Sequence, residues 1–157
     1  MSRSIGNRKE NSALLISSSG GHWVQLCRIA AGLQGVTYDV ATVDANIDGL
    51  SPRAVYEIVD FNRNTPFRAL FGFWSVLSAV RKSKATHIVS TGAAPGLFAI
   101  AIGRLMGRRT LWIDSIANAE RLSMSGRVAA MISHVTLTQW EEVAQNHSGV
   151  AYKGRVA

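Results

Sequence analysis

A histidine directly follows two glycines near the start of the chain. An apolar run precedes this Gly20-Gly21-His22 segment, and a stretch with helical spacing follows it. A strand, a glycine-rich turn and a helix bring backbone N–H groups and the positive end of a helix dipole to one point, which suits a phosphate. A phosphate cradle needs no histidine, so His22 adds a titratable group at the same place. The alternative is that the glycines make only a tight turn and that His22 only caps the helix at the surface.

A second turn of small residues precedes another helical stretch. Here Thr91, Gly92 and Ala93 are candidate ligand-binding residues, and Pro95 suits the first position of a helix. Two such turns at one crevice favour a diphosphate ligand. Alternatively, Gly92 and Gly96 only allow a helix and the sheet to pack closely.

Alternating strand-like and helix-like patterns must position these turns. The predicted strands are 13–17, 37–43, 55–59, 87–90, 110–114 and 134–138. The predicted helices are 23–34, 66–83, 95–106 and 125–133, with a short last helix at 140–146. Such alternation is typical of a parallel, doubly wound α/β sheet. A chain of 157 residues that is 47% hydrophobic suits one domain. We therefore expect a single Rossmann-like domain over residues 13–157 and a flexible leader over residues 1–12.

Ligands bind beyond the carboxyl ends of the strands in sheets of this kind. The segments expected at that edge are 17–22, 44–48, 60–65, 91–96, 114–125 and 139–142. Besides the two turns, they contain the carboxylates Asp114 and Glu120 and the hydroxyl of Ser115. Glu141 is also there, and we expect it to be structural or to lie at a subunit interface.

The charge balance indicates an anionic partner. The chain has 17 Lys and Arg against 10 Asp and Glu, a net charge of +7, which suits nucleic acid, a phosphorylated substrate or acidic lipid. No zinc finger, basic zipper region or RNA-binding aromatic motif accompanies this charge, so we expect no nucleic acid partner. The single cysteine, Cys27, offers no internal disulfide or metal cluster and is expected to be buried and inert, as in a reducing compartment. We expect no metal, no cofactor and no secretory signal.

The predicted helix 66–83 is unusually rich in aromatic residues. One helical stripe that could face the core consists of Phe67, Leu70, Phe71, Trp74 and Leu77. A further arc with Phe73, Val76 and Val80 makes the helix more apolar than one sheet face requires. Basic residues flank the helix, so Phe71, Phe73 and Trp74 are predicted to contact an anionic membrane surface. The alternative is a large core helix or one that a partner covers. The apolar stretch 93–102 is too short to span a bilayer.

Five segments together carry a family resemblance: SSGGH at 18–22, STGAAP at 90–95, WIDS at 112–115, LSMSG at 122–126 and QWEE at 139–142. In this order they resemble the family of asparagine-linked glycosylation protein fourteen and its bacterial polysaccharide counterparts, from about Ala13 to Gly154. No transmembrane helix like that of the eukaryotic members is predicted, which favours the bacterial type. Ser17 stands where bacterial members often have Gly, and Asp114 where members often have Glu.

The resemblance implies the amino-terminal half of a split GT-B glycosyltransferase, similar in fold to the peptidoglycan transferase MurG. This half would hold a lipid-pyrophosphate-linked sugar acceptor and lie peripherally on the cytoplasmic face of a membrane. A separate subunit would bind the UDP-sugar donor, and the chain alone would be inactive.

Sugar transfer without a metal requires a base for the acceptor hydroxyl and positive charge for the departing UDP. His22 is expected to be either that base or a contact to the acceptor phosphate, with Asp114 and Glu120 as reserve carboxylates. The residues expected to bind substrate are Ser19, Gly20, Gly21, Thr91, Gly92, Ala93 and Ser115. The charge for UDP is expected from the partner subunit.

Two other classes of protein compete with this interpretation. A dinucleotide-binding oxidoreductase domain would use Asp44 to bind a ribose, but no third glycine follows Gly20-Gly21 at the required spacing. A non-catalytic membrane scaffold would recruit an enzyme without itself contributing to the reaction.

Overall fold

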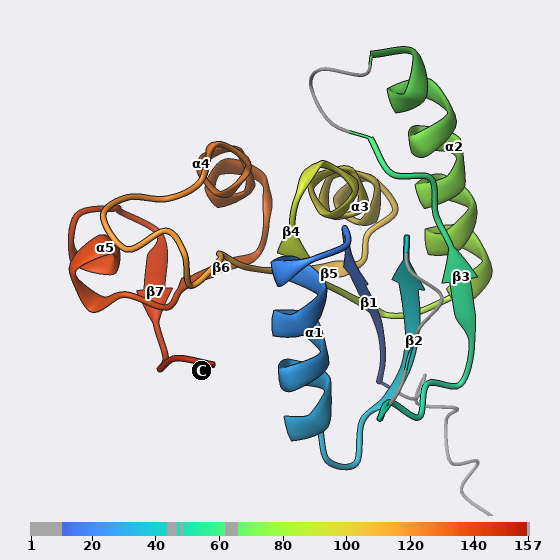
Figure 1. Cartoon of the computed structure of the whole chain (residues 1–157), viewed down its shortest axis with the longest axis horizontal. Coiled ribbons are helices and arrows are strands. Elements are labelled where there is room, and N and C mark those ends of the chain that lie inside the picture. Colours follow the sequence, from blue (N-terminus) through green and yellow to red (C-terminus); the bar gives the residue numbers. More distant parts are fainter. Residues whose placement is uncertain (1–10, 44–46, 48, 62–65, 157) are drawn as a thin grey trace, which may run out of the picture.

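The computed structural model describes residues 11–43, 47, 49–61 and 66–156. Within them the chain alternates between strands and helices, as predicted (Figure 1). The strands are β1 (Ser12–Ser17), β2 (Thr37–Thr42), β3 (Val55–Glu57), β4 (His87–Gly92), β5 (Arg109–Ile113), β6 (Val135–Thr138) and β7 (Val150–Tyr152). The helices are α1 (Gly21–Gly32), α2 (Pro66–Ser83), α3 (Ala94–Leu105), α4 (Met124–Ile132) and α5 (Glu141–Gln145).

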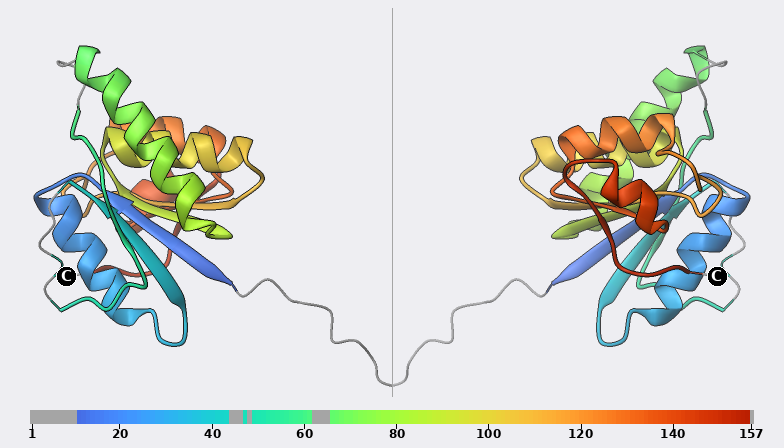
Figure 2. Two further views of the ribbon diagram at one scale, coloured as in Figure 1. Left: turned by 90° about the vertical axis from the view of Figure 1, so that its right-hand side faces the viewer. Right: turned by 90° about the vertical axis from the view of Figure 1, so that its left-hand side faces the viewer.

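All seven described strands form one parallel sheet in the order β3-β2-β1-β4-β5-β6-β7. Helix α1 covers one face, and α2, α3 and α4 cover the other (Figure 2). Because strand side chains alternate, Leu14 and Ile16 enter the core under α2–α4, whereas Ala13 and Leu15 enter the core under α1. The prediction of a Rossmann-like α/β sheet is confirmed.

Element boundaries differ from the prediction in ways that matter for the site. Helix α1 begins at Gly21, two residues early, so His22 lies inside its first turn. Strand β4 runs on to Gly92. Ser123 caps α4, because its Oγ accepts the Gly126 N–H at 2.8 Å. Strand β7 was not predicted, since three residues give too short a pattern.

Helix α2 presents the opposite face to the one predicted. Phe67, Leu70, Phe71 and Trp74 are 88%, 61%, 67% and 59% exposed, and we call these four residues the exposed α2 stripe. Val76 and Val80 are fully buried instead. The sheet is covered by the arc of smaller side chains, which allow a close approach, so the prediction that the aromatic stripe faces the core is wrong.

Phe73 is the one proposed membrane residue that points toward the core. It is half-buried and packs edge-to-face on Phe98, with ring centroids 6.0 Å apart. Phe73 also contacts Trp74 edge-to-face, with ring centroids 5.7 Å apart, and its partial burial argues against a membrane contact.

Some predictions concern residues that lie outside those described by the structure. These are residues 1–10 of the predicted leader, Asp44 of the oxidoreductase alternative, and most of segments 44–48 and 60–65. Ser12, assigned to the leader, is already part of β1. Among the helices that are described, none is long and apolar enough to cross a membrane.

Candidate functional site

The strand order of this sheet reverses between β1 and β4. In doubly wound sheets a ligand crevice opens at this switch point, beyond the carboxyl ends of the strands. Helix α1 begins after β1 and helix α3 begins after β4, so both helix N-termini meet there. The two predicted turns of small residues are thus brought together.

His22 and Thr91 hold the two turns against each other. The Nδ1–H of His22 donates to the Thr91 carbonyl oxygen at 2.8 Å, and the Thr91 hydroxyl donates to the His22 carbonyl oxygen at 2.8 Å. Because a carbonyl only accepts, this contact places the ring proton on Nδ1. In the neutral ring Nε2 then has a lone pair, and no hydrogen bond to it is found within the described part of the chain.

Gly92 provides the space that His22 occupies. A Cβ at Gly92 would lie 2.7 Å from the imidazole, and its φ of +121° is one that L side chains rarely adopt. The Ser18 N–H donates to the Gly92 carbonyl oxygen at 3.0 Å, and the Ala93 N–H donates to Ser18 Oγ at 3.3 Å. His22 is therefore part of a joined pair of turns, and the alternative of a simple surface cap does not describe its contacts. Gly96, in contrast, does serve close packing, because a Cβ there would overlap Ser90 Oγ.

The N-termini of α1 and α3 have no side-chain caps. Gly20 is the N-cap residue of α1 and has a φ of +70°, a backbone conformation that favours glycine. A Cβ at Gly21 would meet nothing within 4 Å, so the chain itself does not explain this glycine. Ser19, Gly20 and Gly21 are all exposed. The first-turn N–H groups of α1 therefore face open space at the crevice.

Asp114 is buried and fully engaged. Its side chain is 1% exposed. Oδ1 accepts hydrogen bonds from Trp112 Nε1 at 3.1 Å and Ser123 Oγ at 2.6 Å. Oδ2 accepts from the Ser123 N–H at 2.8 Å and from Asn118 Nδ2 at 3.2 Å. These contacts fix the loop between β5 and α4. The geometry favours a structural role for Asp114 over that of a reserve base, because four donors occupy its oxygens.

The other predicted site residues form no hydrogen bond with His22 in the described part of the chain. Ser115 is half-buried and its Oγ accepts from the Ala117 N–H at 3.3 Å. Glu120 is exposed at a shallow hollow with Asn118 and Arg121. Over the described residues, no hydrogen bond joins Glu120 to His22 or Asp114, and no group of three His, Cys, Asp or Glu could hold a metal ion. Glu141 is exposed at the start of α5.

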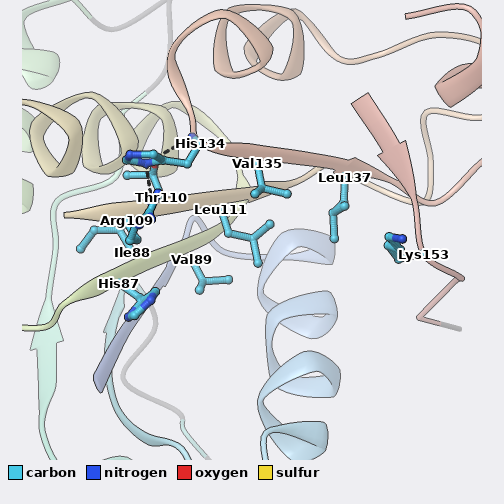
Figure 3. Close-up of a pocket in the computed structure, with 10 residues that line it drawn as sticks. All are labelled: His87, Ile88, Val89, Arg109, Thr110, Leu111, His134, Val135, Leu137 and Lys153. Carbon is cyan, nitrogen blue, oxygen red and sulfur yellow. Dashed lines mark hydrogen bonds between the residues drawn. The ribbon is translucent and has the colours of Figure 1, made fainter. Parts of the chain in front are cut away.

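An apolar groove lies on the α1 side of the sheet, over β4, β5 and β6 (Figure 3). Its volume is about 480 Å³, and Val89, Leu111, Val135 and Leu137 form its floor. Arg109 and Lys153 lie at its rim, together with His87 and His134. The sequence did not predict this groove, because it depends on which strands α1 leaves uncovered.

The surroundings of His134 and Cys27 shift the pKa values of these two side chains. His134 is largely exposed, and its pKa is lowered by desolvation, followed by the charges of Arg104 and Arg109. Cys27 is half-buried rather than buried as expected, and desolvation raises the pKa of its thiol, which agrees with low reactivity.

Sequence reasoning missed two buried glutamines. Gln25 on α1 and Gln139 after β6 are 4% and 1% exposed. Both amides donate to the main-chain oxygen of Asp114, at 3.3 and 3.1 Å. Gln25 interrupts the buried face of its helix next to Leu26, and that polar residue on an apolar face was the available signal.

The fold and the crevice define a Rossmann-like domain of the GT-B kind. Acinetobacter baumannii MurG has a TM-score of 0.70 at 14% identity, and the match covers 90% of this chain and 45% of MurG. A Neisseria meningitidis UDP-GlcNAc 2-epimerase also has a TM-score of 0.70, at 11% identity, over 92% of this chain and 47% of the epimerase. The chain thus spans somewhat less than half of each of these proteins.

In sequence the chain is similar to the UDP-N-acetylglucosamine transferase subunit ALG14. The human protein is 22% identical over 99% of this chain and 87% of its own length, and the Rattus norvegicus protein is 20% identical over the same shares. No family model matches the chain. The resemblance that the five motifs indicate is confirmed, and it supports a glycosyltransferase subunit.

Proposed function

We propose that this chain is the acceptor-binding subunit of a two-component glycosyltransferase. It binds a lipid-pyrophosphate-linked sugar at a membrane surface, and a partner subunit supplies the UDP-sugar. The observation that carries this proposal is the His22–Thr91 contact at 2.8 Å, which leaves Nε2 of the neutral ring as a proton acceptor at the crevice. The relatives named as transferase subunits agree with it.

In the proposed reaction, the acceptor hydroxyl attacks C1 of the donor sugar and the bond from C1 to the UDP oxygen breaks. The hydroxyl proton passes to His22 Nε2, and UDP leaves on the partner subunit. The Thr91 carbonyl stabilises the ring once it is doubly protonated, because Nδ1–H already points at that oxygen.

The diphosphate of the acceptor is proposed to bind at the paired N-termini of α1 and α3. Both helices are 12 residues long and lack a side-chain cap, so their first N–H groups and dipoles favour an anion. The open space beside Gly21 lets a phosphate oxygen approach the backbone. Ser19, Ala93 and Ser115 lie on the segments around this position.

The membrane contact is proposed to be the exposed α2 stripe. It places large apolar side chains on the surface of a region without acidic residues, since no Asp or Glu occurs between Asp60 and Asp114. Arg68, Arg81 and Lys82 on the same helix are positive and exposed. An apolar stripe with basic neighbours suits a surface of anionic lipid, and peripheral binding needs no spanning helix.

The partner subunit is proposed to dock in the apolar groove over β4–β6. Parallel sheets are normally covered on both faces, yet among the described residues α1 covers these strands only in part and leaves the groove open. Its apolar floor and the positive charges of Arg109 and Lys153 fit one occupant: a helix of the partner whose apolar stripe is flanked by carboxylates.

The experiment compares His22→Ala with His147→Ala in the assembled complex. His147 is a matched control, because its Nδ1 also donates to a carbonyl oxygen, that of Val143 at 2.9 Å, but it lies at the end of α5. Loss of a general base typically costs about 10²–10⁴ in rate. We expect His22→Ala to lower transfer at least tenfold, in kcat if His22 is the base and in acceptor affinity if it contacts phosphate.

Transfer is measured with and without a donor-binding subunit, using a short polyprenyl diphosphate sugar as acceptor and a set of UDP-sugars. Full activity of folded His22→Ala would contradict the catalytic proposal, and robust turnover by the chain alone would contradict the split enzyme.

A further inference from the structure

Gln25 links the helix of His22 to the loop after β5. Its side chain is 4% exposed and lies one turn after His22 on α1. Nε2 donates to the carbonyl oxygens of Ile113 at 3.4 Å and Asp114 at 3.3 Å, and Oε1 accepts from the Ile116 N–H at 3.3 Å. One buried amide therefore bonds the last residue of β5 and two residues of the turn that follows it.

Gln139 holds the same turn from the other side. Its Nε2 donates to the Asp114 carbonyl oxygen at 3.1 Å, and its Oε1 accepts from the Val156 N–H at 2.8 Å. Trp140 adds a third contact, because its indole N–H donates to the Ile116 carbonyl oxygen at 2.7 Å. The turn over residues 114–116 is thus held by α1 and by the end of β6, and the chain after β7 in turn holds Gln139.

An apolar side chain at position 25 would fill the core beside Leu26 without these bonds. Burying an amide is unfavourable unless its polar atoms are paired, and here they are paired with the loop rather than with α1 itself. The loop carries Ser115, and α1 carries His22, so these bonds fix two walls of the crevice relative to each other.

We propose that Gln25 is a positioning residue, which holds the turn 114–116 against the N-terminal turn of α1 in the geometry that binds a diphosphate. The identity of the ligand rests on the proposed function, whereas the effect on the turn does not. A preformed site does not have to order its walls when the ligand arrives, so loosening the turn weakens binding.

The test compares Gln25→Met with Leu26→Met in the full chain. Leu26 is the adjacent, fully buried residue, so its variant controls for a change in core packing alone. The first readout is hydrogen exchange of the Trp140 indole N–H, which reports on the turn without any ligand. The second readout is the affinity for farnesyl diphosphate. Far-UV circular dichroism checks the fold, and Gln25→Asn, with a shorter side chain, replaces Gln25→Met if that variant does not fold.

We expect Gln25→Met to speed indole exchange at least tenfold and to weaken farnesyl diphosphate at least fivefold, with both values near wild type in Leu26→Met. Unchanged exchange in Gln25→Met would overturn the inference. Faster exchange in Gln25→Met with unchanged affinity for farnesyl diphosphate would also overturn the inference. If His22→Ala still weakened binding in that case, the proposed acceptor site would stand. Failure of the wild-type chain to bind the diphosphate at all would instead overturn the proposed acceptor site.

Discussion

At the scale of single residues, the structure separates groups that face the crevice from groups that build it. His22 has one ring nitrogen committed to Thr91 and one without a described partner. Asp114 has both oxygens committed to donors of its own loop. The sequence indicated both as candidates, because type and spacing predict which residues reach a strand end. Which of them keeps a free atom depends on contacts between distant segments, and spacing does not predict those.

Gly92 allows a prediction at this scale. In Gly92→Ala the new methyl group would displace the His22 ring from Thr91, so we expect transfer by the complex to fall at least tenfold. Gly107→Ala is the matched control, because Gly107 has a φ of +70° but its Cβ would meet nothing within 4 Å. Both variants are expected to lose about 1 kcal/mol or more of stability from backbone strain. Thermal denaturation and a transfer assay are the measurements. Equal activity of the two variants would contradict the placement of His22 in the site.

At the scale of elements, the pattern of apolar residues predicted where α2 lies in the chain but not which side of it meets the sheet. The helix has two apolar arcs, and the buried arc contains Val76 and Val80 rather than the aromatic stripe. The pattern cannot rank two arcs, because the choice depends on how closely α2 approaches α3 and the sheet. The short strand β7 was missed for a related reason, since it is defined by its pairing with β6.

The orientation of α2 changes the membrane test. We expect Phe71→Glu with Trp74→Glu to reduce binding to vesicles that contain anionic lipid at least fivefold, with no change in circular dichroism, because both side chains are exposed. Added salt is expected to weaken wild-type binding further, since it screens the basic residues of α2. Phe73→Glu is the contrasting variant and is expected to unfold the protein, because it places a charge against Phe98. Undiminished vesicle binding by the double variant would exclude this stripe.

His134, between α4 and β6, leads to a prediction about how stability depends on pH. Desolvation and the nearby Arg104 and Arg109 lower the pKa of His134 in the folded chain. The unfolded chain therefore binds the proton more readily, near its ordinary value of about 6.5. Neutral His134 therefore contributes to the free energy of unfolding. This contribution is fully present above about pH 6.5 and is lost as the pH falls below that value. We expect a shallower decline between pH 7 and pH 5 for His134→Asn in urea denaturation. An identical decline would contradict it.

At the scale of the whole molecule, the described residues form one sheet whose two faces are covered unequally. The α2–α4 face is covered, whereas β4–β6 on the α1 side carry the apolar groove. The alternation of strands and helices predicted the sheet. It did not predict the apolar groove, because a crossover helix covers only the strands that it lies across.

The groove gives a prediction about assembly. We expect Val135→Asp to weaken association with a donor-binding subunit at least tenfold, because it puts a charge into the apolar floor. Val55→Asp is the matched control, since Val55 is also an exposed strand valine (41% against 48%) but lies on β3 at the far edge of the sheet. Co-purification and titration of the two subunits measure the effect. Equal loss in both variants would indicate general destabilisation and contradict the groove as the docking surface.

The chain after β7 has a practical consequence for anyone preparing this protein. Arg155 lies over the Trp140 ring at 3.9 Å and donates to the Gln139 carbonyl oxygen, and the Val156 N–H donates to Gln139 Oε1. A purification tag joined shortly after Val156 would therefore begin close to the glutamine that holds the turn after β5. A tag joined ahead of β1 would enter at the opposite edge of the sheet, where the strands begin. Protein for binding and activity measurements is better tagged at that end.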